Sequence, residues 1–537
     1  MKKIFRYPFL LLVAWILDRV IVSVAQIDAI QSLRPLFILL GIVFCTALVI
    51  QRFIKEWHRT DFIIFMIILM LIVYQSLYGL FKRDLEAYAD LLGLLLIPLM
   101  ALLYSYIISN RVWKSIKDPG RLTYYFNFVF SLLLIFQAAR FVGIAHSLLT
   151  ENTQVPLSAI PPLSKEIHLS SALRPDIYVI VLDGYGRKDV LQKVYGYDNS
   201  QFLSTLKQRG FYVPTENHSN YIETPFAMAA LWNFDYEIPW NSSGDYAQYV
   251  TTPIQNNRVF QLLKEIGYTT VSFDGSASYT QIQSADVFFS DFVPLNKFES
   301  FLLAGTPLEP LSDAFGLRLP IPNYTTHRLR ANYKLNKIQE IPTLIPSPKI
   351  TYFHILVPHP PFIFDENGNP TNPPRPYSIY DANEFQGSRE EYQKGYRAQV
   401  IFINGKILGV VDALLKKSKQ PPIIVIMGDH GPGSMFNFDI ANPGCVWERT
   451  RNLYAIYLPG HENDSKLHPS ISPVNTFRVI FDTYFGTDLP LLEDRTYLMA
   501  SQYPTQVLDV TDTRDSLQGC TLSTNQNDTT KLPSVSP

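Results

Sequence analysis

The chain has 537 residues, of which 47% are hydrophobic and 17% charged, and its formal net charge is -1. A charged fraction this far below the roughly 25% of soluble domains indicates a long apolar region, and the balanced charge argues against a nucleic-acid partner. Three cysteines exclude a disulfide-dense scaffold.

The first part of the chain contains five long apolar runs. Each is close to the roughly 20 residues that cross a bilayer. A cleaved signal peptide is the alternative for the first run, but four more runs follow and no small-residue cleavage site is evident. We therefore predict a transmembrane domain of five helices over residues 1–146, with spans at about 7–25, 35–51, 61–81, 88–109 and 122–146.

The short loops between these runs differ in positive charge. One set holds ten basic residues, and the other holds three, namely Arg34, Lys82 and Arg83. The positive-inside rule puts the richer set in the cytoplasm and everything after residue 146 outside the cell membrane. The richer set is Lys2, Lys3, Arg6, Arg52, Lys55, Arg59, Arg111, Lys114, Lys117 and Arg121.

Two charged residues, Asp18 and Arg19, lie inside the first run. Such residues either pair within the helix bundle or contact a polar lipid headgroup. The sequence alone leaves both readings open.

The rest of the chain reads as a linker, an α/β domain and a tail. Residues 147–175 mix Pro, Ser and charge without periodicity, which predicts a juxtamembrane linker. Apolar β-branched runs then alternate with helical patterns, which predicts an extracytoplasmic α/β domain over 176–508 with a mostly parallel central sheet. The tail, 509–537, lacks aromatic residues and is predicted to be disordered. Strands are expected at 177–182, 269–273, 350–357, 423–427 and 453–458, and helices at about 198–209, 224–233, 254–266, 389–417 and 473–485.

Polar residues follow three of the predicted strands. Asp183 follows the first, His359 follows the strand at 350–357, and Asp429 and His430 follow the strand at 423–427. Singly, each has a plain structural explanation, such as a turn or a loop cap. Because parallel strands end at one edge of a sheet, these residues are expected to meet there. Two carboxylates and two imidazoles suit a divalent cation such as Mn, Zn or Mg.

Thr224 is the candidate nucleophile. It precedes Pro225 and a helical apolar pattern, so it is predicted at a helix N-cap. A plain cap is the alternative to a catalytic role. Beside a cation, however, the hydroxyl can ionise, and the helix amides can receive a developing anion.

These segments together resemble a known family. VIVLDGYGR, SNYIETPFAMAALWN, VPHPPF and GDHGPGS, in this order behind five spans, resemble the alkaline phosphatase superfamily, in its sulfatase-like membrane branch of lipoteichoic acid synthases and lipid A phosphoethanolamine transferases. The resemblance implies that Asp183, Asp429 and His430 bind one metal ion with Thr224 as the metal-bound nucleophile, and that His359 contacts the substrate phosphate. It also implies a phospho-threonine intermediate.

Two departures from the family pattern bear on the substrate. The segment Thr-Pro-Phe-Ala that begins at Thr224 lacks the Cys or Ser and the Arg of true sulfatases, which disfavours sulfate-ester hydrolysis. The synthases commonly have Phe-His-Gly where this chain has Phe273-Asp274-Gly275. A carboxylate there repels phosphate unless it holds a cation or an amine, which weighs against phosphoglycerol as the donor group.

Three functions are consistent with the sequence. The leading one is a membrane-anchored transferase that moves a phospho-headgroup, of phosphoglycerol or phosphoethanolamine type, from a phospholipid to a glycan or lipid acceptor of the cell envelope. The second is a phosphodiesterase or sulfatase-like hydrolase with the same threonine and metal. The third is a non-catalytic glycan-binding protein.

Two smaller features leave alternatives open. Arg449 and Arg451 either bind phosphate or form ion pairs. Cys445 and Cys520 are both predicted outside the cell membrane and either pair or stay free.

Overall fold

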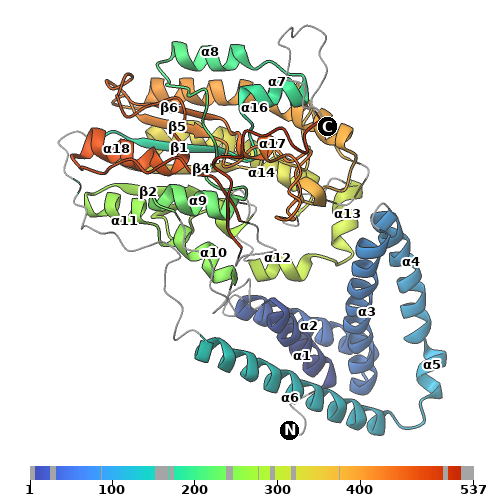
Figure 1. The fold of residues 1–537 in the computed structure, drawn as a ribbon. Helices are drawn as coiled ribbons and strands as arrows, with labels where there is room; N and C mark the ends of the chain where they lie inside the picture. The colour runs from blue at the N-terminus through green and yellow to red at the C-terminus, as the bar shows by residue number, and fades with distance from the viewer. Residues whose placement is uncertain are drawn as a thin grey trace.

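A computed structural model provides the structure of the chain. It describes residues 6–23, 32–85, 88–151, 169, 174–236, 246–275, 277–290, 297–315, 322–373, 375, 377–499 and 506–521. An N-terminal group of helices packs below an α/β domain (Figure 1).

The N-terminal helices match the predicted apolar runs. Four of them are long and apolar enough to cross a membrane, with mean hydropathy from 1.6 to 2.4. The helices are α1 (Tyr7–Ser23), α2 (Leu33–Ile54), α3 (Trp57–Asp84), α4 (Ala89–Ile107), α5 (Asn110–Ser115) and α6 (Pro119–Glu151).

Helix α1 differs from the other four predicted spans because it has 17 residues, just under the usual length of a span. Its predicted end, at 24–25, lies outside the described residues. One further helix, α16 (Arg389–Lys417), is also long and apolar enough to span. It is instead a core helix of the α/β domain, where Tyr396, Val400 and Ile407 are fully buried.

Large apolar side chains cover the outside of the N-terminal helices. Phe37, Phe53, Leu102 and Ile135 are each between 65% and 81% exposed. Exposed apolar surface of this extent is rare on soluble domains and is normal where helices face lipid. The prediction of a hydrophobic helix bundle before an α/β domain is therefore confirmed.

A six-stranded sheet forms the centre of the second domain. Its order is β3-β2-β4-β1-β5-β6, and every pairing is parallel except that of β5 with β6, which is antiparallel. This confirms the predicted mostly parallel sheet. The strands are β1 (Ile177–Leu182), β2 (Thr269–Phe273), β3 (Val287–Phe289), β4 (Lys349–Ile355), β5 (Ile423–Met427) and β6 (Tyr454–Tyr457).

Helices cover both faces of this sheet (Figure 1). Tyr178, Ile180 and Leu182 of β1 pack on one face, and the alternate residues of the same strand pack on the other, as a strand buried on both sides requires. The first face holds α7 (Lys188–Tyr195), α8 (Ser200–Gln208), α14 (Tyr324–Lys337) and α16. The second face holds α9 (Thr224–Asn233), α10 (Tyr246–Gln255), α11 (Arg258–Glu265) and α18 (Thr476–Phe485).

Two short helices of the second domain contact the N-terminal bundle. They are α12 (Lys297–Leu303) and α13 (Leu308–Phe315), and they lie between the domain and the bundle in Figure 1. Arg34, at the start of α2, forms an ion pair with Glu299, and Lys82, near the end of α3, forms one with Glu309. Phe298 is buried among apolar residues of the bundle. These contacts mark the end of the bundle that faces the α/β domain.

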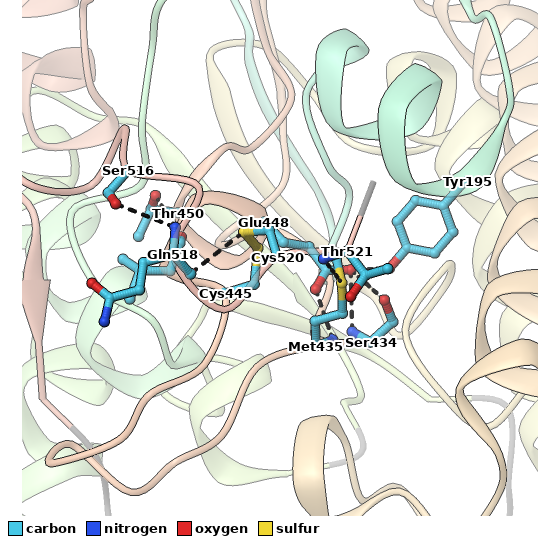
Figure 2. The surroundings of a disulfide bond; sticks show 11 residues. Tyr195, Ser434, Met435, Cys445, Glu448, Thr450, Ser516, Gln518, Cys520 and Thr521 are labelled. Atoms are coloured by element: carbon cyan, nitrogen blue, oxygen red, sulfur yellow. Dashed lines mark hydrogen bonds between the residues drawn. A yellow bond between two sulfur atoms is a disulfide. The ribbon is translucent and has the colours of Figure 1, made fainter. Parts of the chain in front are cut away.

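The C-terminal segment differs from the predicted disordered tail over its first part. Residues 508–509 form strand β8, which pairs with β7 (Tyr497–Leu498), and a disulfide joins Cys445 to Cys520 (Figure 2). The composition of this segment did not reveal its order, because the order comes from residues far away in sequence. Residues 522–537 lie outside the described residues.

The disulfide leads to a stability prediction. Substituting Cys445→Ser and Cys520→Ser together is expected to lower the free energy of unfolding by about 2–4 kcal/mol, because the bond closes a long loop of the unfolded chain. Thermal unfolding in detergent, with and without reductant, measures this. Reductant is expected to lower the melting temperature of wild type and to leave that of the double variant unchanged. Cys45→Ser, which removes a free cysteine and keeps the disulfide, is the control and is expected to respond to reductant as wild type does.

Candidate active site

Three strand ends place the predicted residues at one edge of the sheet. Asp183 directly follows β1, and Asp429 and His430 follow β5 after a single glycine. β1 and β5 are parallel neighbours, so the two ends meet. All three side chains are at most 2% exposed. The structure thus brings together the residues that the sequence suggested.

The geometry of this cluster fits a divalent cation. One ligand atom from each of Asp183, Asp429 and His430 lies within 4.8 Å of the others. His430 Nε2 is 3.4 Å from Asp429 Oδ2 and 3.8 Å from Asp183 Oδ1. Among the described residues, the buried Asp183 Oδ1 has no hydrogen-bond partner. A buried, unsatisfied carboxylate oxygen is costly, and a cation would satisfy it.

The pKa shifts of Asp183 and His430 also favour a cation at this cluster. Burial, followed by the negative charge of Asp429, raises the pKa of Asp183 well above its usual value. Burial and the positive charge of Arg449 lower the pKa of His430 to about 4, which keeps its imidazole neutral at pH 7. Metal ligands must be deprotonated. Two adjacent buried carboxylates and a neutral imidazole therefore form a set that is stabilised by a cation.

Thr224 lies at the start of α9 and points into the cluster. Its hydroxyl donates a hydrogen bond to Asp429 Oδ2 at 2.6 Å and lies 3.3 Å from His430 Nε2. The predicted N-cap is wrong by one residue, because the extended backbone of Glu223 places the cap there and Thr224 in the first turn. The Thr224 hydroxyl is therefore hydrogen-bonded to a candidate metal ligand.

His359 lies beside the cluster. Its ring centroid is 6.4 Å from that of His430, and its backbone N–H donates to the carbonyl of Asp183 at 3.1 Å. Its Nδ1 lies 2.6 Å from the carbonyl oxygen of Pro360, while Nε2 lies 3.6 Å from Asp381 Oδ2. His359 therefore lies beside the candidate metal ligands without being one of them.

His354, on strand β4, was missed by sequence reasoning. Its Nε2 lies 3.0 Å from Asp183 Oδ2, and its Nδ1 lies 2.8 Å from the hydroxyl of Tyr352. His354 thus orients the carboxylate of Asp183, a candidate metal ligand, through the oxygen Oδ2. A polar residue within the buried run ITYFHILV was the available signal.

Asp381 was also missed by sequence reasoning. Its ion pair with Arg449 is one of the two roles that the sequence left open for that arginine. The Arg449 guanidinium donates to Asp381 Oδ2 at 2.5 Å and to the carbonyl of Ile222 at 2.8 Å, and its Nη2 lies 3.3 Å from His430 Nε2. Arg449 therefore forms a buried ion pair next to the cluster. Asp381 lies in an irregular segment without periodicity, so no sequence pattern marked it.

Arg451 and Asp274 also form ion pairs, each with other residues. Arg451 forms ion pairs with Asp189 and Asp515. Asp274, at the carboxyl end of β2, accepts a hydrogen bond from Ser290 at 3.2 Å and lies 3.5 Å from the Nε of Arg330. The guanidinium of Arg330 is thus a cation beside Asp274 of the kind that would offset the repulsion between this carboxylate and a phosphate.

No protein-family model and no curated protein matches this chain.

Solved structures of similar fold include phosphoethanolamine transferases and sulfatases. The zinc complex of the C-terminal periplasmic domain of EcEptC from Escherichia coli is 12% identical, with 66% of this chain and 97% of that chain covered and a TM-score of 0.43. The lipooligosaccharide phosphoethanolamine transferase EptA from Neisseria meningitidis is 11% identical, with 77% and 70% covered and a TM-score of 0.38. A sulfatase described as putative, from Bacteroides thetaiotaomicron, is 14% identical, with 61% and 78% covered and a TM-score of 0.36. At these values, the function of this chain rests on the geometry of its own site.

Proposed function

We propose that this protein is a membrane-anchored, metal-dependent enzyme of the alkaline phosphatase superfamily. It moves a phospho-headgroup from a phospholipid to a glycan or lipid acceptor of the cell envelope, through a phospho-threonine intermediate. The observation that carries the proposal is the Thr224 hydroxyl, 2.6 Å from Asp429 Oδ2 within a buried Asp-Asp-His cluster.

The N-terminal bundle supports the membrane anchor. Arg34 and Lys82, from the loops poor in positive charge, lie at the end of the bundle that contacts α12 and α13. Arg6 and Asp61, which pair at 3.0 Å, mark the opposite end. In this proposal the positive-inside rule places that opposite end in the cytoplasm and the α/β domain outside.

Asp183, Asp429, His430 and Thr224 would hold one divalent cation, of the Mn, Zn or Mg type. When bound, the cation polarises a phosphoryl oxygen and favours the ionised form of a nearby hydroxyl. The identity of the ion belongs to the proposal, since carboxylate and imidazole ligands suit all three.

The first half-reaction follows from the placement of Thr224. Thr224 Oγ1 forms a bond to the phosphorus of the phospholipid, and the bond from phosphorus to the diacylglycerol oxygen breaks. The hydroxyl proton passes to Asp429 Oδ2, to which it already points. The N-terminal end of α9, where Thr224 lies, carries a positive partial charge that stabilises the developing negative charge. His359 donates a proton to the departing diacylglycerol oxygen.

The second half-reaction reverses these roles. An acceptor hydroxyl loses its proton to His359 and attacks the phosphorus, and Thr224 Oγ1 leaves with its proton restored. Water in place of that hydroxyl turns the same site into a phosphodiesterase. Both functions share the first half-reaction, so only the second distinguishes them.

Intact-protein mass spectrometry tests the proposal. Wild type is exposed briefly to a phospholipid with an isotope-labelled headgroup, and a mass increase equal to the labelled phospho-headgroup is expected on Thr224. Release of the adduct by a glycan hydroxyl faster than by water supports the transferase. Absence of any adduct at every time point, with turnover intact, contradicts the phospho-threonine intermediate.

His359→Ala is expected to lower kcat by about 10²–10⁴-fold, the usual contribution of a general acid or base. The metal content is expected to stay at the wild-type value, because His359 is outside the ligand cluster. Steady-state kinetics and elemental analysis of the purified variant measure the two quantities. His461→Ala, which alters an exposed histidine, is the matched control and is expected to leave both unchanged.

The orientation of the bundle has its own test. Single cysteines introduced at Lys55 and Lys114 are expected to resist a membrane-impermeant thiol reagent in intact cells, and a cysteine after Thr150 is expected to react. The background for all three is Cys45→Ser, because Cys45 is the free cysteine among the described residues. Protection of the cysteine after Thr150, or reaction of those at Lys55 and Lys114, would overturn the orientation.

A further inference from the structure

Four polar side chains meet between α1 and α6, away from the candidate active site. Asp18 accepts hydrogen bonds from Arg19 at 2.8 Å, from Gln137 at 3.1 Å and from Arg140 at 3.2 Å, and Arg140 also donates to Gln137 at 2.8 Å. The sequence left two explanations for Asp18 and Arg19. In the structure both residues pair within the bundle, which is the first explanation, but this pairing does not neutralise the positive charge of both arginines.

The charge of this cluster does not balance. Two guanidinium groups share one carboxylate, so the cluster carries one excess positive charge. Asp18, Arg19 and Arg140 are the only charged residues in Tyr7–Ser23 and in residues 122–145. An uncompensated charge within an apolar bundle is costly and commonly marks a functional site.

The guanidinium groups of Arg19 and Arg140 also have N–H donors available for a ligand. A guanidinium carries five N–H donors. Within the part of the chain that the structure describes, the buried Nε of Arg19 has no hydrogen-bond partner, and both hydrogen bonds of Arg140 come from Nη1. The Arg19 and Arg140 side chains are 29% and 41% exposed. An anion can therefore reach both.

The position along α1 indicates which anion is available. Asp18 and Arg19 lie five and four residues before Ser23, where α1 ends, or about 6–8 Å below that end at 1.5 Å per residue. In the proposed orientation this is the outer leaflet, near its headgroup boundary. This step rests on the proposed membrane placement and is independent of the proposed chemistry.

We propose that Arg19 and Arg140 bind the phosphate of an anionic phospholipid of the outer leaflet, with Gln137 as an additional donor. Guanidinium groups match phosphate oxygens in geometry and form charge-assisted hydrogen bonds with them. A lipid with one net negative charge neutralises the excess charge of the cluster. The site is a lipid-binding site between α1 and α6, separate from Thr224.

Native mass spectrometry of the full-length protein, released from nanodiscs, tests this site. The probes are dioleoyl-phosphatidylglycerol and dioleoyl-phosphatidylcholine, which share acyl chains and phosphate but differ in net charge. Wild type is expected to retain phosphatidylglycerol preferentially, and Arg140→Gln to retain about tenfold less, as expected for the loss of a charge-assisted hydrogen bond. Inorganic phosphate at millimolar concentration is expected not to displace the lipid. Displacement would mean an adventitious anion site and would overturn the proposal.

Two further variants keep the test decisive. Arg121→Gln, at the opposite end of α6 where Arg121 is 81% exposed, is the matched control and is expected to retain lipid as wild type does. Asp18→Asn removes the competing carboxylate, so its retention of phosphatidylglycerol is expected to exceed that of wild type. If the cluster only joins α1 to α6, both Asp18→Asn and Arg140→Gln lower the melting temperature without a change in lipid preference, and the proposal is wrong. Thr224→Ala is expected to retain lipid normally, which separates this test from that of the enzymatic function.

Discussion

Replacing Thr224 with Ala is expected to lower kcat by about 10⁴–10⁶-fold, as loss of a catalytic nucleophile does in other enzymes. In the proposed mechanism the substitution removes the oxygen that attacks phosphorus, while Asp183, Asp429 and His430 stay. Because the Thr224 hydroxyl bonds to Asp429 and not to a helix amide, the loss of capping energy is expected to be small. Turnover of a labelled phospholipid in nanodiscs measures the effect.

Thr476 provides the matched control for this variant. It is a buried threonine at the first position of α18, and its hydroxyl lies 2.9 Å from that of Tyr454. Thr476→Ala therefore removes an equivalent buried hydroxyl from a helix start and is expected to keep wild-type kcat. If Thr224→Ala also turned substrate over at the wild-type rate, Thr224 would be a structural residue and the double-displacement mechanism would be wrong.

Substitution of a proposed metal ligand is expected to have the second large effect. Asp429→Asn is expected to lower metal occupancy and kcat together, because in the proposed mechanism Asp429 supplies both a ligand oxygen and the acceptor for the Thr224 proton. Metal added at about 100 times its dissociation constant is expected to stabilise wild type by about 2.7 kcal/mol. The thermal shift on metal addition measures this without any substrate, and the variant is expected to lose it.

Asp412→Asn, on the exposed side of α16 where Asp412 pairs with Arg209, is the control for the loss of a carboxylate. Treatment of wild type with a chelator is expected to abolish turnover, and Mn, Zn or Mg added singly is expected to show which ion restores it. Full metal occupancy in a variant that lacks Asp183, Asp429 and His430 would place the ion elsewhere in the protein.

The strands that carry the site could be predicted from sequence because their signals are local. Ile177–Leu182 and Ile423–Met427 are short runs of apolar residues, and both match the predicted limits. Asp183 follows the first of these strands directly, and Asp429 and His430 follow the second after one glycine, so their meeting at one edge is a consequence of parallel topology. Strand β3 was not predicted, since its three half-buried residues, Val287–Phe289, are too few to show a period.

The residues that the sequence did not reveal act over long distances. Asp381 gains its role only because Arg449 and His359 are folded against it. Similarly, Asp515 joins the C-terminal segment to His218 and Arg451. Neither residue lies in a periodic pattern, and contacts between distant parts of a chain leave no trace in local composition.

The ion pairs of α12 and α13 with the bundle have a consequence for how substrates reach the enzyme. Glu299 and Glu309 attach the α/β domain to the start of α2 and to the end of α3, independently of the connection after α6. The domain is therefore held at two points on the bundle and cannot swing freely on a tether. In the proposed orientation the height of Thr224 above the lipid surface is constant, so a donor lipid has to rise or bend toward the site. In the proposed function the donor lipid therefore moves to Thr224, whereas an enzyme on a flexible stalk can move to its lipid.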